Sequence, residues 1–339
     1  MTSTLFDFNI VSSIEEIMKN IIFCVFLALA LTNSIEGAST SKKGYIKDIE
    51  RAPSMPIESH YSLGLESLDR CDYEEAIRQF AVVISNFTGF SHLAESHYFL
   101  GIAYFRVEEY DFANDSFTNY LKCTNQPKYF EETLGYKYTI AEKFRLGAKR
   151  HFFGTKQMPK WGSGHALALQ IYDEVIYSLP CHEYAALSLF AKASMLWSNY
   201  EWREAVDCYQ TLIRRFPKHE LAPQAYLCIN RVYLEQSARE FQNPDLIVLA
   251  QINLRKFAKD FPKDERLANA EADVQCIKEV YAGGLYGTAR YYERTGKIGA
   301  SIIYYQSAIK QFPDTKIAER CQNRLIELNA VPEGLASNS

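Results

Sequence analysis

Residues 201–217 read EWREAVDCYQTLIRRFP, and the pattern within them recurs along the chain. A small residue, Ala205, is followed four positions later by an aromatic residue, Tyr209, and eight positions after that by Pro217. Residues four apart lie on one face of a helix, and proline cannot continue the helix before it. The stretch therefore predicts a helix that carries a small residue next to an aromatic one and then stops sharply.

The same spacing links four further pairs: Ala76 and Phe80, Ala113 and Phe117, Ala168 and Tyr172, and Ser301 and Tyr305. Twelve positions after Ala168, Ala250 and Ser301 the chain also has proline, at Pro180, Pro262 and Pro313. Twelve positions before a repeat's small residue lies another small residue, at Gly64, Gly101, Ala193 and Ala289. Two antiparallel helices can cross closely where both present small side chains, and the aromatic ring then fills the space toward the next hairpin.

A single helix hairpin cannot bury its apolar faces alone, so such hairpins stack into an array. The spacing of 37 residues between Ala76 and Ala113 is close to the roughly 34 residues of a tetratricopeptide unit. We therefore predict an all-α fold, a tetratricopeptide-like α-solenoid of about five helix hairpins.

The composition and net charge of the chain limit the classes of function that it can have. With 47% hydrophobic and 14% aromatic residues the chain can bury a large core, and a net charge of -4 argues against nucleic acid as a partner. No C-x-x-C pair and no H-x-x-x-H spacing occurs, so we predict no metal site and no cofactor.

The chain divides into five expected segments. Residues 21–31 are an uncharged apolar run, too short for a membrane-spanning helix, so we expect a signal peptide over residues 1–34, with Met18 as the alternative start. The segments that follow are a flexible linker over 35–56, N-terminal tetratricopeptide hairpins over 57–150, C-terminal tetratricopeptide-like hairpins over 151–330 and a disordered tail over 331–339.

Two stretches have the residue types of a catalytic site without its geometry. Gly162-Ser163-Gly164-His165 lacks the preceding strand of a nucleophile elbow. Cys181-His182-Glu183 lies at consecutive positions where a helix begins, so the three side chains point in different directions. We predict that the protein is not an enzyme; a hydrolase with a helical accessory array would need a catalytic domain outside residues 57–329.

The last hairpin, from Ala289-Arg290-Tyr291-Tyr292-Glu293-Arg294 to Phe312-Pro313-Asp314-Thr315, and the stretch Phe152-Phe153-Gly154 resemble the BamD family of outer-membrane protein assembly factors. The resemblance implies a periplasmic scaffold at the inner face of the outer membrane. Its expected partners are a BamA-like barrel-inserting subunit, docked on the C-terminal hairpins, and unfolded outer-membrane proteins, received by the N-terminal ones. Membrane association would come through a partner or an anchor.

Two positions depart from the family pattern. Members are usually lipidated on a cysteine directly after the signal sequence, but here no cysteine follows the apolar run until Cys71. Tyr304 stands where the family commonly carries an arginine in the penultimate helix. The alternative function is an exported tetratricopeptide coordinator of the Tol-Pal and cell-division type.

Three groups of residues are candidates for protein binding. A helix crossing at Gly101 places Tyr98, Phe105 and Arg106 on a neighbouring face, and aromatic residues with arginine are typical of binding hot spots. The alternative for Phe105 is packing against the next hairpin. The remaining candidates are Phe152 and Phe153 in the long loop 151–164, and Arg290, Arg294 and Tyr304 in the last hairpin, where two merely solvated arginines are the alternative.

Overall fold

The structure is a computed structural model that describes residues 53–154, 158–240, 243 and 245–330. The predicted signal peptide, the C-terminal tail and residues 35–52 of the predicted linker lie outside these ranges. Thirteen α-helices make up 77% of the described residues, which confirms the all-α prediction. Within the described residues no helix is both long enough and apolar enough to cross a membrane.

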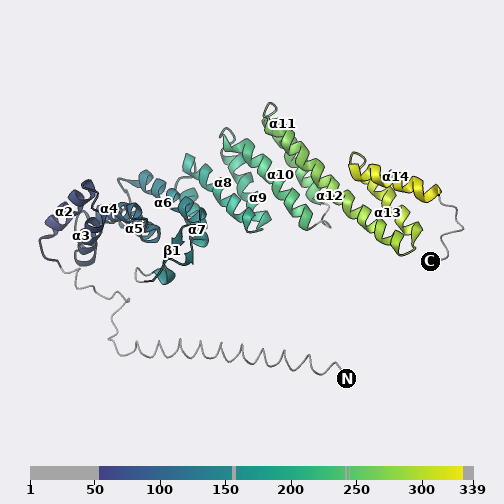
Figure 1. The fold of residues 1–339 in the computed structure, drawn as a ribbon. Helices are drawn as coiled ribbons and strands as arrows, with labels where there is room; N and C mark the ends of the chain where they lie inside the picture. The colour runs from purple at the N-terminus through teal and green to yellow at the C-terminus, as the bar shows by residue number, and fades with distance from the viewer. Residues whose placement is uncertain (1–52, 155–157, 241–242, 244, 331–339) are drawn as a thin grey trace, which may run out of the picture. The chain divides into compact units, whose positions relative to one another are not determined.

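The helices follow one another with short turns between them, except for the longer connection from α6 to α7 (Figure 1). They are α2 (Ile57–Asp69), α3 (Tyr73–Asn86), α4 (Leu93–Arg106), α5 (Tyr110–Cys123), α6 (Phe130–Arg145), α7 (His165–Ser178), α8 (Glu183–Ser198), α9 (Trp202–Arg215), α10 (Leu221–Arg239), α11 (Asp245–Asp260), α12 (Arg266–Arg294), α13 (Ile298–Gln311) and α14 (Lys316–Ala330). Each helix packs on its neighbours in sequence, so consecutive helices form stacked hairpins of the tetratricopeptide type.

The repeat pattern marks the helix crossings. All five small residues and all five aromatic rings of the pattern are fully buried: Ala76, Ala113, Ala168, Ala205, Ser301, Phe80, Phe117, Tyr172, Tyr209 and Tyr305. The Phe80 ring lies against Gly64, and the Phe117 ring lies so close to Gly101 that an added Cβ would be 2.6 Å from Cε1. Phe117 also stacks on Tyr136 of the next hairpin, with centroids 5.2 Å apart. In the first two hairpins the aromatic ring therefore reaches the next hairpin, as predicted.

The turn inside four of the hairpins has the same backbone geometry. One residue in each turn adopts the left-handed conformation, namely Cys71 (φ 60°), Glu108 (φ 60°), Tyr200 (φ 65°) and Gly296 (φ 74°). Two backbone hydrogen bonds close each turn; in the second hairpin Glu108 N donates to Phe105 O and Glu109 N to Tyr104 O. These hydrogen bonds satisfy backbone carbonyl groups at the end of the first helix of each hairpin. Only one of the four residues is a glycine, so the sequence does not reveal the shared turn.

A small antiparallel β pair interrupts the third hairpin. Strands β1 (Lys149–Arg150) and β2 (Gly162–Ser163) pair Lys149 with Ser163 and Arg150 with Gly162, and the 3₁₀ turn η2 (Phe152–Gly154) follows β1. Helices α6 and α7 still pack on each other across this insertion. One buried cluster contains both Phe144 and Ala168, so the core continues across the expected segment boundary at residue 150.

Helix α12 is twice as long as its neighbours, with 29 residues. Its first half packs on α10 and α11, its second half packs on α13, and α14 contacts both halves, at Glu279 and at Glu293 (Figure 1). Because one continuous helix serves both groups, the last hairpin is joined to the preceding one without a turn.

Candidate binding surfaces

Tyr98, a predicted contact residue on α4, lies inside the N-terminal core. It is only 6% exposed, and its ring stacks on Tyr129 with centroids 4.3 Å apart and an interplanar angle of 7°. Burial raises the pKa of its phenol well above the ordinary value. A partner cannot reach this ring, so burial replaces the expected surface role of Tyr98 with a packing role.

Phe105 and Arg106 at the end of α4 have different surroundings. Phe105 is half-buried and meets Tyr110 and Tyr136 edge-on, with centroids 5.7 Å and 5.2 Å apart. Because Tyr136 belongs to α6, this geometry agrees with the alternative that Phe105 packs against the next hairpin. Arg106 is exposed. Of the three candidates on α4, only Arg106 presents its side chain to solvent.

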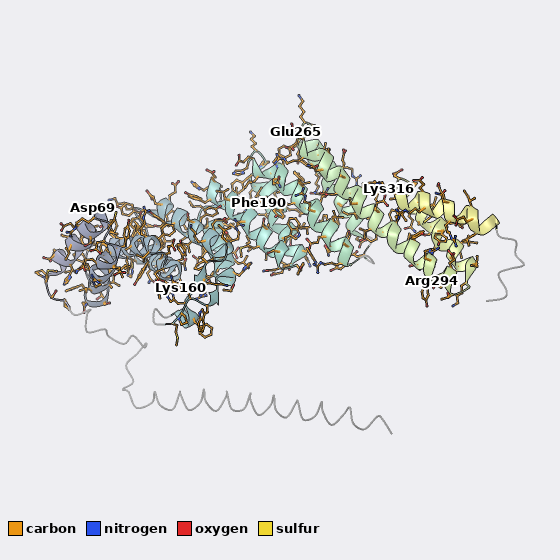
Figure 2. The ribbon with its side chains drawn as sticks, in the orientation of Figure 1. Asp69, Lys160, Phe190, Glu265, Arg294 and Lys316 are labelled. Atoms are coloured by element: carbon orange, nitrogen blue, oxygen red, sulfur yellow. The ribbon has the colours of Figure 1, made fainter. Side chains whose placement is uncertain are left out.

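The β1–β2 hairpin, residues 149–163 without 155–157, carries the loop candidates Phe152 and Phe153. Phe152 is 47% exposed, and the side chain of Phe153 lies outside the described part of the structure. Two further apolar residues of this hairpin are exposed, Met158 and Trp161, the latter to 77%. Figure 2 shows Lys160 on a projection beyond the helices around it.

Buried polar contacts fasten the β1–β2 hairpin to the start of α5. The backbone N and Nδ1 of His151 lie 2.9 and 3.0 Å from Asp111 Oδ2, and both residues are nearly fully buried. Lys160 Nζ lies 3.2 Å from Glu109 Oε2 and donates to the carbonyl of Glu108. An isolated two-stranded hairpin is marginally stable, so these contacts to α5 hold it in place.

The same cluster is a group of metal-ligand atoms that the sequence spacing did not reveal. Glu109, Asp111 and His151 each offer one ligand atom, and these atoms lie within 4.8 Å of one another. The His151 Nδ1 and the Lys160 ammonium already face the two carboxylates. We therefore interpret the cluster as the fastening of the hairpin rather than as a cation site.

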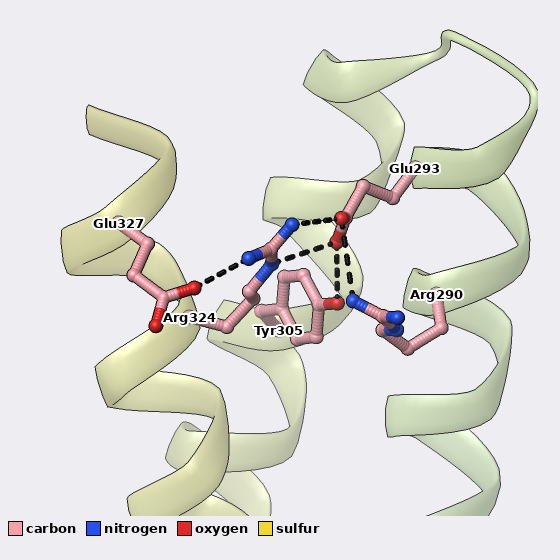
Figure 3. Close-up of polar contacts among 5 residues, drawn as sticks. All are labelled: Arg290, Glu293, Tyr305, Arg324 and Glu327. Carbon is pink, nitrogen blue, oxygen red and sulfur yellow. Dashed lines mark hydrogen bonds and ion pairs between the residues drawn. The ribbon is translucent and has the colours of Figure 1, made fainter. Parts of the chain in front are cut away.

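The last hairpin is fixed by a polar network around Glu293 (Figure 3). Arg324 from α14 donates hydrogen bonds from Nε and Nη2 to the Glu293 carboxylate. The Tyr305 hydroxyl from α13 donates to Glu293 Oε2 at 2.8 Å, and Arg290 Nη1 lies 3.3 Å from Glu293 Oε1. A second contact joins Arg324 to Glu327. The hydrogen bonds from Arg324 lower the pKa of the Glu293 carboxyl. The network ties α12, α13 and α14 into one unit.

The predicted contact residues of this hairpin divide by exposure. Arg290 is partly exposed and paired with Glu293, whereas Arg294 is exposed and has no partner among the residues that the structure describes. Tyr304 is half-buried and stacks on Tyr292, with centroids 5.4 Å apart and an interplanar angle of 13°. Arg294 is therefore the candidate most accessible to a partner.

Sequence reasoning missed the exposed apolar residues of the C-terminal half. Val248, Leu249 and Ile252 lie at helical spacing on one side of α11, and Tyr291 and Ile303 are exposed on α12 and α13. Helix α11 also buries Leu246, Ile247 and Ala250, so apolar residues surround much of it. Apolar residues on several sides of one helix can be seen in the sequence, and they indicate contacts on more than one side.

The two stretches with catalytic residue types have structural roles. His182 Nε2 lies 2.9 Å from Glu131 Oε1, and its Nδ1 accepts a hydrogen bond from Tyr184 N at the start of α8. Ser163 Oγ accepts one from His165 N. His182 is therefore the N-cap of α8, whereas the Ser163 contact lies just before Gly164, the N-cap of α7.

A family model described as an outer membrane lipoprotein, YfiO, matches residues 166–332. The matched region begins in α7 and contains α8 to α14, with the Glu293 network. A comparison with curated proteins found no match.

Solved structures of repeat proteins resemble the chain weakly. A tetratricopeptide protein from Bacteroides fragilis is 10% identical, with 81% of this chain and 100% of its own covered at a TM-score of 0.39. MamA from Desulfovibrio magneticus is 15% identical, with 64% and 95% covered at a TM-score of 0.33. Likenesses at these scores say nothing about function. Together, the family match and the helical-repeat fold are typical of scaffold proteins without enzymatic activity.

Proposed function

We propose that the chain is a periplasmic scaffold that takes part in assembling β-barrel proteins into the outer membrane, in the manner of BamD. The observation that carries the proposal is the match of residues 166–332 to an outer membrane lipoprotein family. Helix hairpins with this stacking leave long surfaces for other polypeptides.

The C-terminal hairpins are the proposed docking site for a BamA-like barrel-inserting subunit. Arg294 is exposed beside a rigid network, and Tyr291 and Ile303 add exposed apolar area on the same pair of helices. Arginine and tyrosine are enriched at binding hot spots. The N-terminal hairpins, where Arg106 is exposed, are the proposed site for unfolded outer-membrane proteins.

Affinity capture from detergent-solubilised envelopes tests the proposal. We expect the tagged chain to recover a barrel protein with periplasmic repeats. The variant Arg294→Glu should lower its recovery on the order of tenfold, because it places negative charge where a cation faces the partner. The matched control is Arg215→Glu, which changes an exposed arginine at the end of α9.

Two results would count against the proposal. Recovery of only Tol-Pal components or peptidoglycan synthases would favour the alternative coordinator. Equal recovery by Arg294→Glu and Arg215→Glu would remove the last hairpin as the docking site.

A further inference from the structure

The β1–β2 hairpin differs in charge from the rest of the chain. From residue 143 to residue 172 the sequence contains no Asp or Glu, although the whole chain has a net charge of -4. The described part of this stretch contains five basic residues: Lys143, Arg145, Lys149, Arg150 and Lys160. This local charge is suited to an anionic partner.

Some of this positive charge is not neutralised within the protein. Arg145 pairs with Glu142 and Lys160 pairs with Glu109. Lys143 and Lys149 are exposed and have no acidic partner in the described ranges. In the strand pair, Lys149 and Ser163 are both exposed whereas Arg150 and Gly162 are half-buried, so Lys149 lies on the outer face. The unpaired lysines therefore lie near the end of α6 and on the outer face of β1.

The hairpin and the end of α6 also expose large apolar side chains. Trp161 is 77% exposed and Leu146 is 72% exposed, and Phe152 and Met158 are exposed to a lesser degree. The hairpin is held against the start of α5 through the polar contacts of His151 and Lys160. A tryptophan exposed next to lysines is the combination found where proteins meet the headgroup region of a bilayer.

We propose that the β1–β2 hairpin binds the surface of a membrane that contains anionic phospholipid, with Trp161 inserted at the headgroup level and Lys149 facing the phosphates. The contacts between His151 and Asp111 hold the end of β1 against α5, so less ordering is needed when Lys149 and Trp161 bind. This contact goes beyond the proposed scaffold function. The hairpin also lies before the region that matches the lipoprotein family.

Co-sedimentation of the full chain with lipid vesicles tests the proposal. We expect stronger binding to vesicles of mixed phosphatidylglycerol and phosphatidylcholine than to phosphatidylcholine alone. Trp161→Ala should lower the partition coefficient roughly tenfold, because it removes a large apolar side chain from the interface. Lys149→Gln should lower it roughly fivefold, and only for the anionic vesicles.

Two matched controls change exposed residues outside the hairpin. Tyr177→Ala removes an aromatic residue that is 89% exposed on α7, and Lys218→Gln removes an exposed lysine after α9. Neither should change vesicle binding. The apolar run at residues 21–31, which is expected to leave with the signal peptide, is the same in every variant, so differences between variants do not arise from it.

A second measurement locates the tryptophan. Brominated phospholipids should quench a fluorescence component that is present in the wild type and missing in Trp161→Ala, since Trp197 and Trp202 are half-buried in helices. Equal binding by Trp161→Ala and the wild type, or equal binding to both vesicle types, would overturn the proposal. So would binding to polyglutamate without binding to vesicles, which would identify an acidic polypeptide as the partner. Capture of a barrel protein from envelopes can succeed or fail independently of these results.

Discussion

Replacing Gly101 with alanine tests the close crossing of α4 and α5. The added Cβ would lie 2.6 Å from Cε1 of Phe117, whereas carbon atoms in contact are about 3.5 to 4.0 Å apart. The ring must therefore move by about 1 Å. It has little freedom to do so, because Phe117 is fully buried and stacked on Tyr136.

Two effects oppose each other in this variant. Alanine stabilises a helix interior by about 0.5–1 kcal/mol relative to glycine. Overpacking of a well-packed core costs about 1–3 kcal/mol. We expect the clash to prevail, so that Gly101→Ala lowers the free energy of unfolding by about 1–2 kcal/mol.

The same substitution at Gly287 is the matched control. Gly287 lies inside α12, and a Cβ built there meets no atom within 4 Å. Gly287→Ala should stabilise the chain by about 0.5–1 kcal/mol. Because the helix preference cancels between the two sites, their difference measures the overpacking cost, about 1–3 kcal/mol.

Urea unfolding followed by circular dichroism measures both variants. The urea midpoint should fall for Gly101→Ala and rise for Gly287→Ala. If both midpoints rise by the same amount, the crossing is not as close as the structure has it, and the account of the repeat pattern fails.

Three further predictions concern polar contacts. Lys137 is fully buried and contacts both Asn114 on α5 and Glu174 on α7. Lys137→Met should therefore lower the free energy of unfolding, measured with urea, by about 1–3 kcal/mol. An unchanged free energy of unfolding would show that these contacts are dispensable. The pKa of Glu293 is lowered by Arg324, so the stability from this pair is full above the unfolded-state pKa of a glutamate and is lost as pH falls through the lower folded-state value. In the variant Arg324→Gln the urea midpoint should therefore fall less steeply below about pH 4 than in the wild type. An equally steep fall in both proteins would contradict this. His151→Ala should speed tryptic cleavage of the β1–β2 hairpin, whereas cleavage at the wild-type rate would show that its contact with α5 does not hold it.

The fold was largely predictable from residue spacing. Every small residue and aromatic ring of the repeat is buried where the pattern places it. The expected surface on α4 was harder to predict, because α4 has apolar residues on most sides and periodicity does not select the side that faces the core. Spacing from Gly101 placed Tyr98 and Arg106 near each other, but the structure buries the first and exposes the second.

The β1–β2 hairpin was not predictable as a structure. Each strand has two residues, too few for alternation to appear in the sequence. The hairpin is held in place by His151, which contacts Asp111, 40 residues away along the chain. The basic residues of the segment can be counted in the sequence, but the proposed membrane contact also requires an exposed Trp161, which only the structure shows.

Helices, their crossings and their stops follow from patterns within about one repeat, since each depends on residues that are neighbours along the chain. Exposure of Arg294, burial of Tyr98 and the joining of three helices at Glu293 depend on contacts between distant segments. Such contacts leave no local spacing to read, because any residue of the right type at the right place in space can make them. The helical array is thus encoded locally, whereas the surfaces available to partners arise only when the hairpins pack.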